Sequence, residues 1–152
     1  MTFKDENLDL QHLVRELRVL RDHNRSFKEG DPQDTLLHVA EGAMALIVIE
    51  RFLRAVLHDE ATDTMTLFNL LERAMSRKLV RLPWDDQKIG IKMLTDVRNT
   101  ILHGNFEQAA RLAGCASVPE FFRTQFAGEI EQLHQIAADL FRQIDPITGR
   151  PA

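Results

Sequence analysis

The chain has 152 residues, enough for one domain of ordinary size that buries a core without disulfide bonds or metals. Hydrophobic residues make up 44% and charged residues 28%, a balance typical of globular proteins and not of disordered ones. The net charge of −4 argues against a broad, sequence-independent nucleic-acid binder but allows a small basic site on an acidic body.

Cysteine content and hydropathy give expectations about the compartment. The single cysteine, Cys115, excludes a disulfide within the chain and suits a reducing compartment; we interpret it as a small, half-buried hydrophobic residue rather than a catalytic thiol. Residues 1–9 are polar and acidic, and the longest apolar run, residues 43–49, is too short to cross a bilayer. We therefore expect a cytoplasmic protein that does not contact a membrane.

The first 57 residues predict two long helices. The first spans residues 8–27, with one stripe of leucines at steps of three and four: Leu10, Leu13, Leu17 and Leu20. The second begins with Asp31 as N-cap and Pro32 at the first helical position, and it extends to Leu57. Its apolar face is predicted to consist of Leu36, Val39, Ala43, Leu46, Ile47 and Leu53. The residues around this face are also apolar, which indicates a central position in the fold.

Two more helices follow. The third is predicted from Thr62 or Asp63 to Lys78. The fourth begins after the acidic pair at residues 85–86 and carries apolar residues at four-residue steps. It is expected to end at His103, because Gly104 can take the left-handed conformation that closes helices.

The C-terminal third of the sequence predicts one short helix and one long helix. A short helix is expected over residues 105–113. Ser117 and Glu120 have the spacing of a capping box, from which a last helix runs to Ile144. The sequence therefore predicts an all-α fold, an up-and-down bundle of four long helices plus one or two short helices. We expect a single domain over residues 1–144 and a flexible tail over residues 145–152.

The residues most informative about function are VRNTILHGN at positions 97–105. Arg98 can hold a phosphate through a planar, permanently charged fork, and His103 can take and give a proton near neutrality. Asn99 and His103 are four residues apart and share one helix face. The spacing alone is weak evidence, because Arg18 and His23 repeat it elsewhere. The pair Arg98 and His103 differs from that repeat in three ways: Asn99 follows the arginine, the pair lies at the end of a predicted helix, and Gly104 follows the histidine.

In these residues the chain resembles the HEPN superfamily, small helical bundles of toxin–antitoxin, phage-defence and RNA-processing systems. The hallmark of that family is an arginine, a polar residue, and a histidine four to six positions after the arginine, as in Arg98-Asn99-x3-His103. The resemblance implies an HEPN-like bundle and a metal-independent endoribonuclease, with no cofactor or metal. The 2′-hydroxyl of RNA would attack the adjacent phosphorus and leave a 2′,3′-cyclic phosphate. His103 would act as general acid or base, Arg98 would stabilise the charged phosphorane, and Asn99 would position the histidine or the phosphate.

The same resemblance has consequences for partners. One chain supplies one catalytic histidine, whereas the reaction benefits from an acid and a base, so the family pattern implies a homodimer with a composite site. Family members whose antitoxin adenylylates a tyrosine carry it two positions after the histidine, where this chain has Asn105, and the chain contains no tyrosine. A protein antitoxin or inhibitor would therefore act by binding.

Glu50 falls on the apolar face of the second helix, where a carboxylate needs a partner or becomes neutral. One interpretation is a salt bridge to an arginine of a neighbouring helix. The other is that Glu50 orients Arg98 or His103.

Other features leave alternatives open. Basic residues outnumber acids between Arg73 and Arg98, which suits either phosphate contact or a solvated face. Trp84 is expected in the core, with base stacking as the alternative. Two rival functions remain: a catalytically silent HEPN-like module that binds RNA, a nucleotide or a protein, and a purely regulatory helical dimer.

Overall fold

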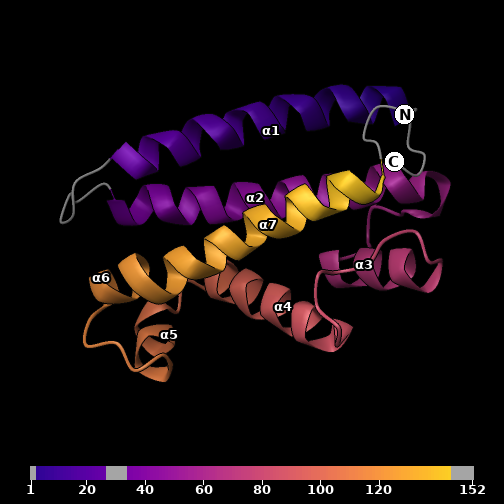
Figure 1. Ribbon diagram of the computed structural model, residues 1–152. Helices are drawn as coiled ribbons and strands as arrows, with labels where there is room; N and C mark the ends of the chain where they lie inside the picture. Colours follow the sequence, from indigo (N-terminus) through magenta and orange to yellow (C-terminus); the bar gives the residue numbers. More distant parts are fainter. Residues whose placement is uncertain (1–2, 27–33, 145–152) are drawn as a thin grey trace.

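The computed structural model describes residues 3–26 and 34–144, and in these ranges the regular secondary structure is helical (Figure 1). The helices, in chain order, are α1 (Phe3–Ser26), α2 (Asp34–Leu57), the 3₁₀ turn η1 (His58–Glu60), α3 (Leu67–Ser76), α4 (Gln87–His103), α5 (Phe106–Leu112), α6 (Val118–Phe121), the π-helical turn η2 (Phe122–Phe126) and α7 (Ala127–Gln143). The predicted all-α bundle is confirmed. The predicted tail, residues 145–152, lies outside the described residues, as do Asp31 and Pro32.

Helix α2 is the central element of the bundle. It runs antiparallel to α1 and also contacts α3, α4 and α7 (Figure 1). Its predicted central position is therefore confirmed. Ile47 is the exception on its apolar face, because 43% of this residue is exposed, contrary to the prediction. The predicted burial of Leu36 concerns a side chain that the structure does not describe, although its backbone belongs to α2.

Two clusters of buried side chains form the core. The larger cluster is built mainly from α2, α3 and α7, and the ring of Phe52 packs edge-on against Phe141 at a centroid distance of 5.0 Å. The smaller cluster contains the phenylalanines of α6 and η2, with Phe106 packed against it. Each fully buried side chain of this size contributes about 1.5–3 kcal/mol. Ile101 of α4 packs against both clusters and so joins them.

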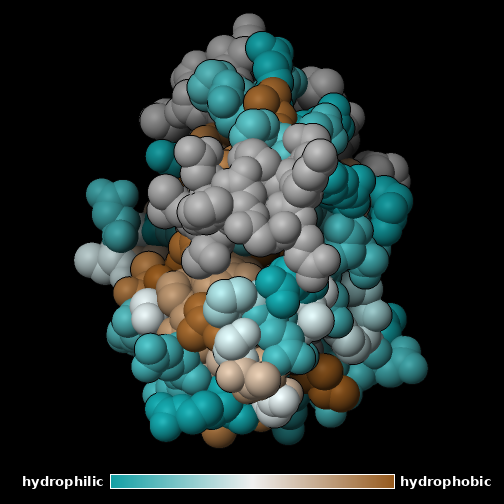
Figure 2. Space-filling view, turned by 90° about the vertical axis from the view of Figure 1, so that its left-hand side faces the viewer, coloured by the Kyte–Doolittle hydropathy of each residue, from teal (hydrophilic) through white to brown (hydrophobic). Residues whose placement is uncertain are grey.

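The end of the bundle that carries α5 and α6 faces the viewer in Figure 2. Hydrophobic residues gather in the lower half of this face, with hydrophilic residues around them. Leu112 of α5, of which 82% is exposed, is the most exposed of the large hydrophobic residues in the described part of the chain. Among the helices described, none is long and apolar enough to span a membrane.

Several helix boundaries differ from those predicted. Helix α1 begins at Phe3 and not near residue 8, because no glycine or proline interrupts residues 3–7. Helix α3 begins at Leu67 and not near Thr62, since its capping oxygen comes from Thr66, whose side chain accepts a bond from the backbone N–H of Asn69 at 3.2 Å. It ends at Ser76, two residues before Lys78, which takes a left-handed conformation with φ 57°.

The predicted last helix is divided into α6, η2 and α7. The capping box at its start is confirmed in its forward half, because Ser117 Oγ accepts from the N–H of Glu120 at 3.2 Å. The carboxylate of Glu120 reaches back to the N–H of Ala116, one residue before the cap, at 2.7 Å. The widened π turn that follows buries both Phe122 and Phe126, whose rings lie 5.0 Å apart.

Candidate functional site

The candidate motif occupies the last two turns of α4, and the ends of this helix agree with the sequence prediction. Asp86 caps the N-terminus by accepting a hydrogen bond from the N–H of Lys88 at 3.0 Å. Gly104 closes the C-terminus in a left-handed conformation with φ 63°, and its N–H donates to the carbonyl of Thr100 at 3.0 Å. His103 is therefore the last residue of the helix, as predicted.

Apolar neighbours anchor the motif to the bundle. Val97, which is 1% exposed, lies in the larger core cluster, and Ile101 packs between the two clusters. Helices α2 and α4 approach closely at this point: a Cβ atom on Gly42 would lie 3.0 Å from Cδ1 of Ile101. The absence of a side chain at Gly42 thus sets how deeply the motif helix is seated.

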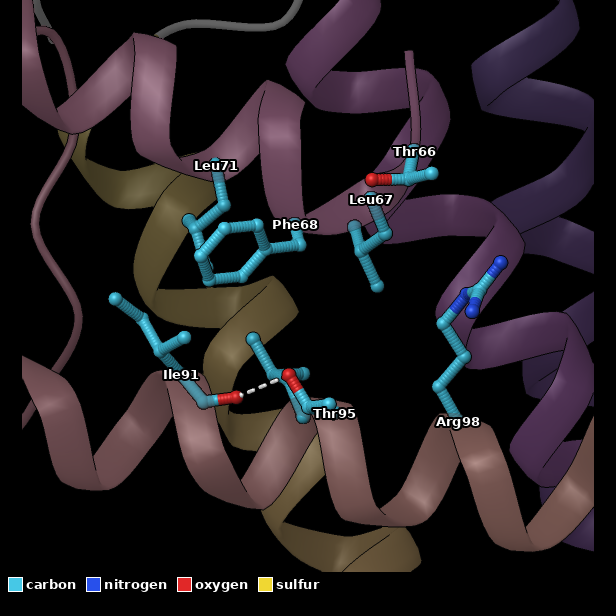
Figure 3. A pocket seen from close by; sticks show the side chains of 8 residues that line it. Thr66, Leu67, Phe68, Leu71, Ile91, Thr95 and Arg98 are labelled. Carbon is cyan, nitrogen blue, oxygen red and sulfur yellow. Dashed lines mark hydrogen bonds between the residues drawn. The ribbon is translucent and has the colours of Figure 1, made fainter. Parts of the chain in front are cut away.

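Arg98 is half-buried and lines a small hollow of about 100 Å³ between α3 and α4. Figure 3 shows its side chain rising from α4 towards the start of α3, where Thr66 and Leu67 lie. The rest of the hollow is mainly apolar. Within the described part of the chain, the guanidinium of Arg98 forms no hydrogen bond or ion pair, so that its five donors are available to a ligand.

Asn99 and His103 lie elsewhere on the helix surface, and both are exposed. Asn99 lines a second, larger hollow formed with α5 and the start of α7. His103 lies one turn further on, and its neighbour Leu102 is 61% exposed. Neither Asn99 nor His103 makes a side-chain hydrogen bond to any other described residue.

The structure therefore brings Asn99 and His103 together on one face of α4 and turns Arg98 towards α3. Arg98 and Asn99 are adjacent in sequence but line different hollows. The three side chains form no hydrogen-bonded cluster among the described residues. A phosphate held by both Arg98 and His103 would have to lie across the exposed surface of the helix end.

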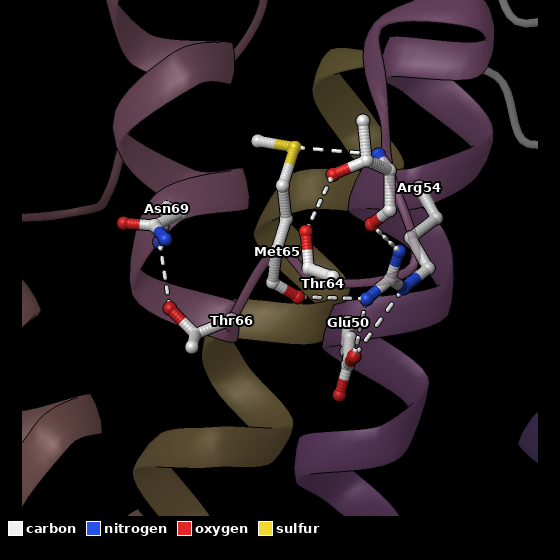
Figure 4. Close-up of polar contacts among 7 residues, drawn as sticks. Glu50, Arg54, Thr64, Met65, Thr66 and Asn69 are labelled. Carbon is white, nitrogen blue, oxygen red and sulfur yellow. Dashed lines mark hydrogen bonds and ion pairs between the residues drawn. The ribbon is translucent and has the colours of Figure 1, made fainter.

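Glu50 differs from its predicted environment. Its side chain is 38% exposed, and its partner is Arg54 on the same helix rather than an arginine of a neighbouring helix. Arg54 donates to Oε1 of Glu50 at 3.1 Å and to the carbonyls of Thr62 and Met65 at 2.9 and 2.8 Å (Figure 4). The pair thus fixes the segment that enters α3. The prediction that Glu50 orients Arg98 or His103 remains a prediction, because its described contacts reach only Arg54.

Part of the basic stretch before the motif is engaged in ion pairs. Arg77 pairs with Glu60 at 2.5 Å, and Lys92 pairs with Asp96 at 2.7 Å. The region therefore presents less free positive charge than its composition suggests.

Trp84 packs against the larger core cluster and lies beside Gly90, as the core interpretation predicted.

Two features of the structure were not predicted from the sequence. One is a buried polar group in which His134 of α7 contacts Glu41 of α2 at 2.9 Å, while the amide of Asn24 donates to the same carboxylate at 3.0 Å. Residues 41 and 134 are 93 positions apart, and nothing in the sequence pairs them. The other is the hollow beside Asn99, which three separate helical segments build.

No group of three or more histidine, cysteine or acidic side chains suited to hold a metal ion occurs among the described residues. Comparisons with models of protein families, with curated proteins and with solved structures found no match to this chain.

Proposed function

We propose that this chain is a metal-independent endoribonuclease of HEPN type that acts in the cytoplasm in a toxin–antitoxin or phage-defence system. The observation that carries the proposal is the placement of Arg98, Asn99 and His103. They lie at the exposed end of a helix whose other side is anchored in the core. All three side chains are free of hydrogen bonds to the described residues, which leaves them available to a substrate.

The proposed reaction needs only a proton acceptor, a proton donor and a cation. A base takes the proton of the ribose 2′-hydroxyl, whose oxygen attacks the adjacent phosphorus. The bond to the 5′-oxygen breaks, and an acid protonates that oxygen, which leaves a 2′,3′-cyclic phosphate and a 5′-hydroxyl. His103 serves as acid or base, Arg98 stabilises the charge on the phosphorane, and Asn99 positions the phosphate or the histidine.

The proposed active form is a homodimer, because one chain supplies one such histidine. A two-fold axis near the end of α4 would place a second copy of the motif opposite the first. Two exposed apolar residues support an interface there: Leu102 lies next to His103, and Phe68, which lines the Arg98 hollow, is 46% exposed. A protein antitoxin would inhibit by covering the same surface.

One observation favours the alternative of a catalytically silent binding module. Arg98 is turned towards α3, and within one chain it shares no hollow with His103. A module of this kind would bind RNA, a nucleotide or a protein without cleavage. In a purely regulatory helical dimer, neither RNA binding nor cleavage would be observed.

The test is the incubation of mixed RNA with excess chelator and an analysis of the product ends. We expect cleavage that leaves cyclic-phosphate ends and falls by about 100-fold or more in His103→Ala and Arg98→Ala. The matched controls are His12→Ala and Arg18→Ala, since both residues are exposed on α1 and have no proposed role. Equal cleavage by the wild type and His103→Ala would overturn the catalytic proposal. RNA binding without cleavage would favour the silent module.

A further inference from the structure

The hollow beside Asn99 has the size of a small-molecule site. Its volume is about 460 Å³, against about 100 Å³ for the hollow that Arg98 lines. Small-molecule sites in proteins span about 300–1,000 Å³. It is formed by residues 92–100 of α4, by α5 with its flanking residues, and by residues of α6, η2 and the start of α7.

The apolar lining residues come from α5, its C-cap and α6, whereas α4 supplies polar residues alone. Helix α5 supplies Ala109 and the highly exposed Leu112, and Phe121 lies beside them. Helix α4 and the η2–α7 segment supply polar groups, among them Asn99 and Gln125. A ligand with a flat apolar face and a polar edge matches this division.

Three primary amides in this hollow are uncommitted. The side chains of Asn99, Asn105 and Gln108 line it and make no hydrogen bonds to other described residues. Asn105 is the N-cap residue of α5, yet its side chain does not cap the helix. Each of these amides offers donors and an acceptor, as the edge of a nucleobase requires.

The charge of the hollow is unsuited to phosphate. Its ionisable lining residues are Lys92, Asp96 and Glu129, and the lysine is already paired with Asp96 at 2.7 Å. Burial raises the pKa of Glu129, the neighbouring Asp96 raises it further, and a hydrogen bond from Gln125 at 3.3 Å opposes both effects. A neutral group bearing N–H bonds would supply the half-buried carboxylate of Glu129 with a further hydrogen-bond donor.

From this combination we infer that the hollow binds an unpaired RNA base that carries an exocyclic amino group: adenine, cytosine or guanine in preference to uracil. The amino group donates to Glu129 or Asp96, the amides of Asn105 and Gln108 contact the rest of the base edge, and Leu112 and Ala109 contact its face. The inference rests on the proposed function, since Asn99 belongs both to the motif and to the hollow. A base held here brings its own phosphodiester towards His103, one turn away.

The experiment measures binding without cleavage. Fluorescent hexamers of 2′-O-methyl adenosine, cytidine and uridine are titrated into the wild-type chain and followed by anisotropy, because the methyl group removes the attacking hydroxyl. We expect the A and C hexamers to bind at least about fivefold more tightly than the U hexamer. Free adenosine and cytidine are titrated as competitors, which separates recognition of the base from recognition of the RNA backbone.

Two variants locate the preference. Glu129→Gln removes the carboxylate and is expected to reduce the A-over-U and C-over-U ratios to about twofold or less. Gln108→Ala, on the exposed side of α5, is expected to weaken all three hexamers without unfolding the chain. The control is Glu72→Gln, an exposed carboxylate that lines a separate hollow formed by η1, α3 and the segment between them. It should leave the ratios unchanged, and thermal melting checks that each variant is folded.

The outcomes separate this inference from the proposed function. Equal binding of the three hexamers, no binding, or an unchanged ratio in folded Glu129→Gln overturns the inference even if natural RNA is cleaved. A base preference that depends on Glu129 supports it even if no cleavage of natural RNA is detected, in which case only the catalytic proposal fails.

Discussion

The imidazole Nε2 of His134 lies 2.9 Å from Oε2 of Glu41, so that a buried polar contact joins α7 to the central helix α2. Both side chains are less than one-tenth exposed. Asn24 of α1 donates to the other carboxylate oxygen at 3.0 Å, and three helices therefore meet at one carboxylate. Removing one partner of a buried group of this kind leaves the remaining polar atoms without bonds.

This contact predicts a pH dependence of stability. Burial raises the pKa of Glu41, but hydrogen bonds from His134 and Asn24 and the electrostatic effect of His134 and His38 outweigh it, so that the pKa lies below its ordinary value of 4.5. A carboxylate with a lowered folded-state pKa contributes stability above its unfolded pKa and loses it as the pH falls through the folded pKa.

The measurement is urea unfolding of the wild type and Glu41→Gln between about pH 6 and pH 3. The variant should be less stable near pH 6, and the difference between the two proteins should shrink below about pH 4.5. Glu107→Gln, an exposed carboxylate of α5, serves as control. A difference that stays constant down to the lowest pH would contradict the prediction.

Arg54 is predicted to matter more for stability than its partner Glu50. Arg54→Ala removes two hydrogen bonds to carbonyls of the loop before α3, and we expect a loss of about 1–3 kcal/mol in the free energy of unfolding. Glu50→Gln weakens only a partly exposed ion pair and should cost less than about 1 kcal/mol. Arg142→Ala is the control, since that arginine is exposed and, among the described residues, pairs only with Asp139. Equal losses for Arg54 and Arg142 would show that the loop contacts add nothing.

The close approach of α2 and α4 is testable with a double-mutant cycle. Alanine in place of a helical glycine normally stabilises by up to about 1 kcal/mol, and we expect that gain for Gly128→Ala, where a Cβ meets open space. Gly42→Ala should lack the gain, because its Cβ would lie 3.0 Å from Cδ1 of Ile101. Ile101→Val removes that atom and should restore the gain. Thermal or urea unfolding of the wild type, the two single variants and the double variant measures the coupling, and simple additivity would contradict it.

Gly104 is predicted to hold the end of the motif helix through its backbone alone. Its φ of 63° disfavours other residues, whereas a Cβ at this position would meet open space. Gly104→Ala should therefore destabilise by about 1 kcal/mol, and Gly104→Asn should cost less because asparagine tolerates this conformation. If the proposed function holds, cleavage should fall in the same order. Similar losses for both variants would point to a cause other than backbone conformation.

Local signals explain which parts of the fold were predictable. Asp86 and Gly104 define both ends of α4, and Ser117 marks the start of α6, because capping depends on residues within a few positions of each other. The observed start of α3 differs from the predicted one because the side chains of Thr62 and Thr66 are both able to cap a helix. The choice between them depends on Arg54, whose bonds to the carbonyls of Thr62 and Met65 hold that stretch outside the helix.

The helical periodicity of α2 and α4 does not determine which contacts the side chains of Glu50, Arg98 and Asn99 make. The periodicity of α2 placed Glu50 on an apolar face, but a side chain at the edge of that face can turn along the helix to Arg54. For the candidate site, the sequence identified Arg98, Asn99 and His103 but not that Arg98 and Asn99 line different hollows. That separation depends on where α3 and α5 pack against α4, which a single helical pattern does not contain.

The position of Ile101 between the two core clusters has a mechanical consequence. Because interiors are packed as densely as crystals, α4 cannot rotate or slide unless both clusters rearrange together. The end of α4 thus has the stiffness of the bundle and not that of a surface loop. Any ligand or partner that engages this end must fit the helix backbone where it stands, and adjustment is left to the rotamers of Arg98, Asn99 and His103.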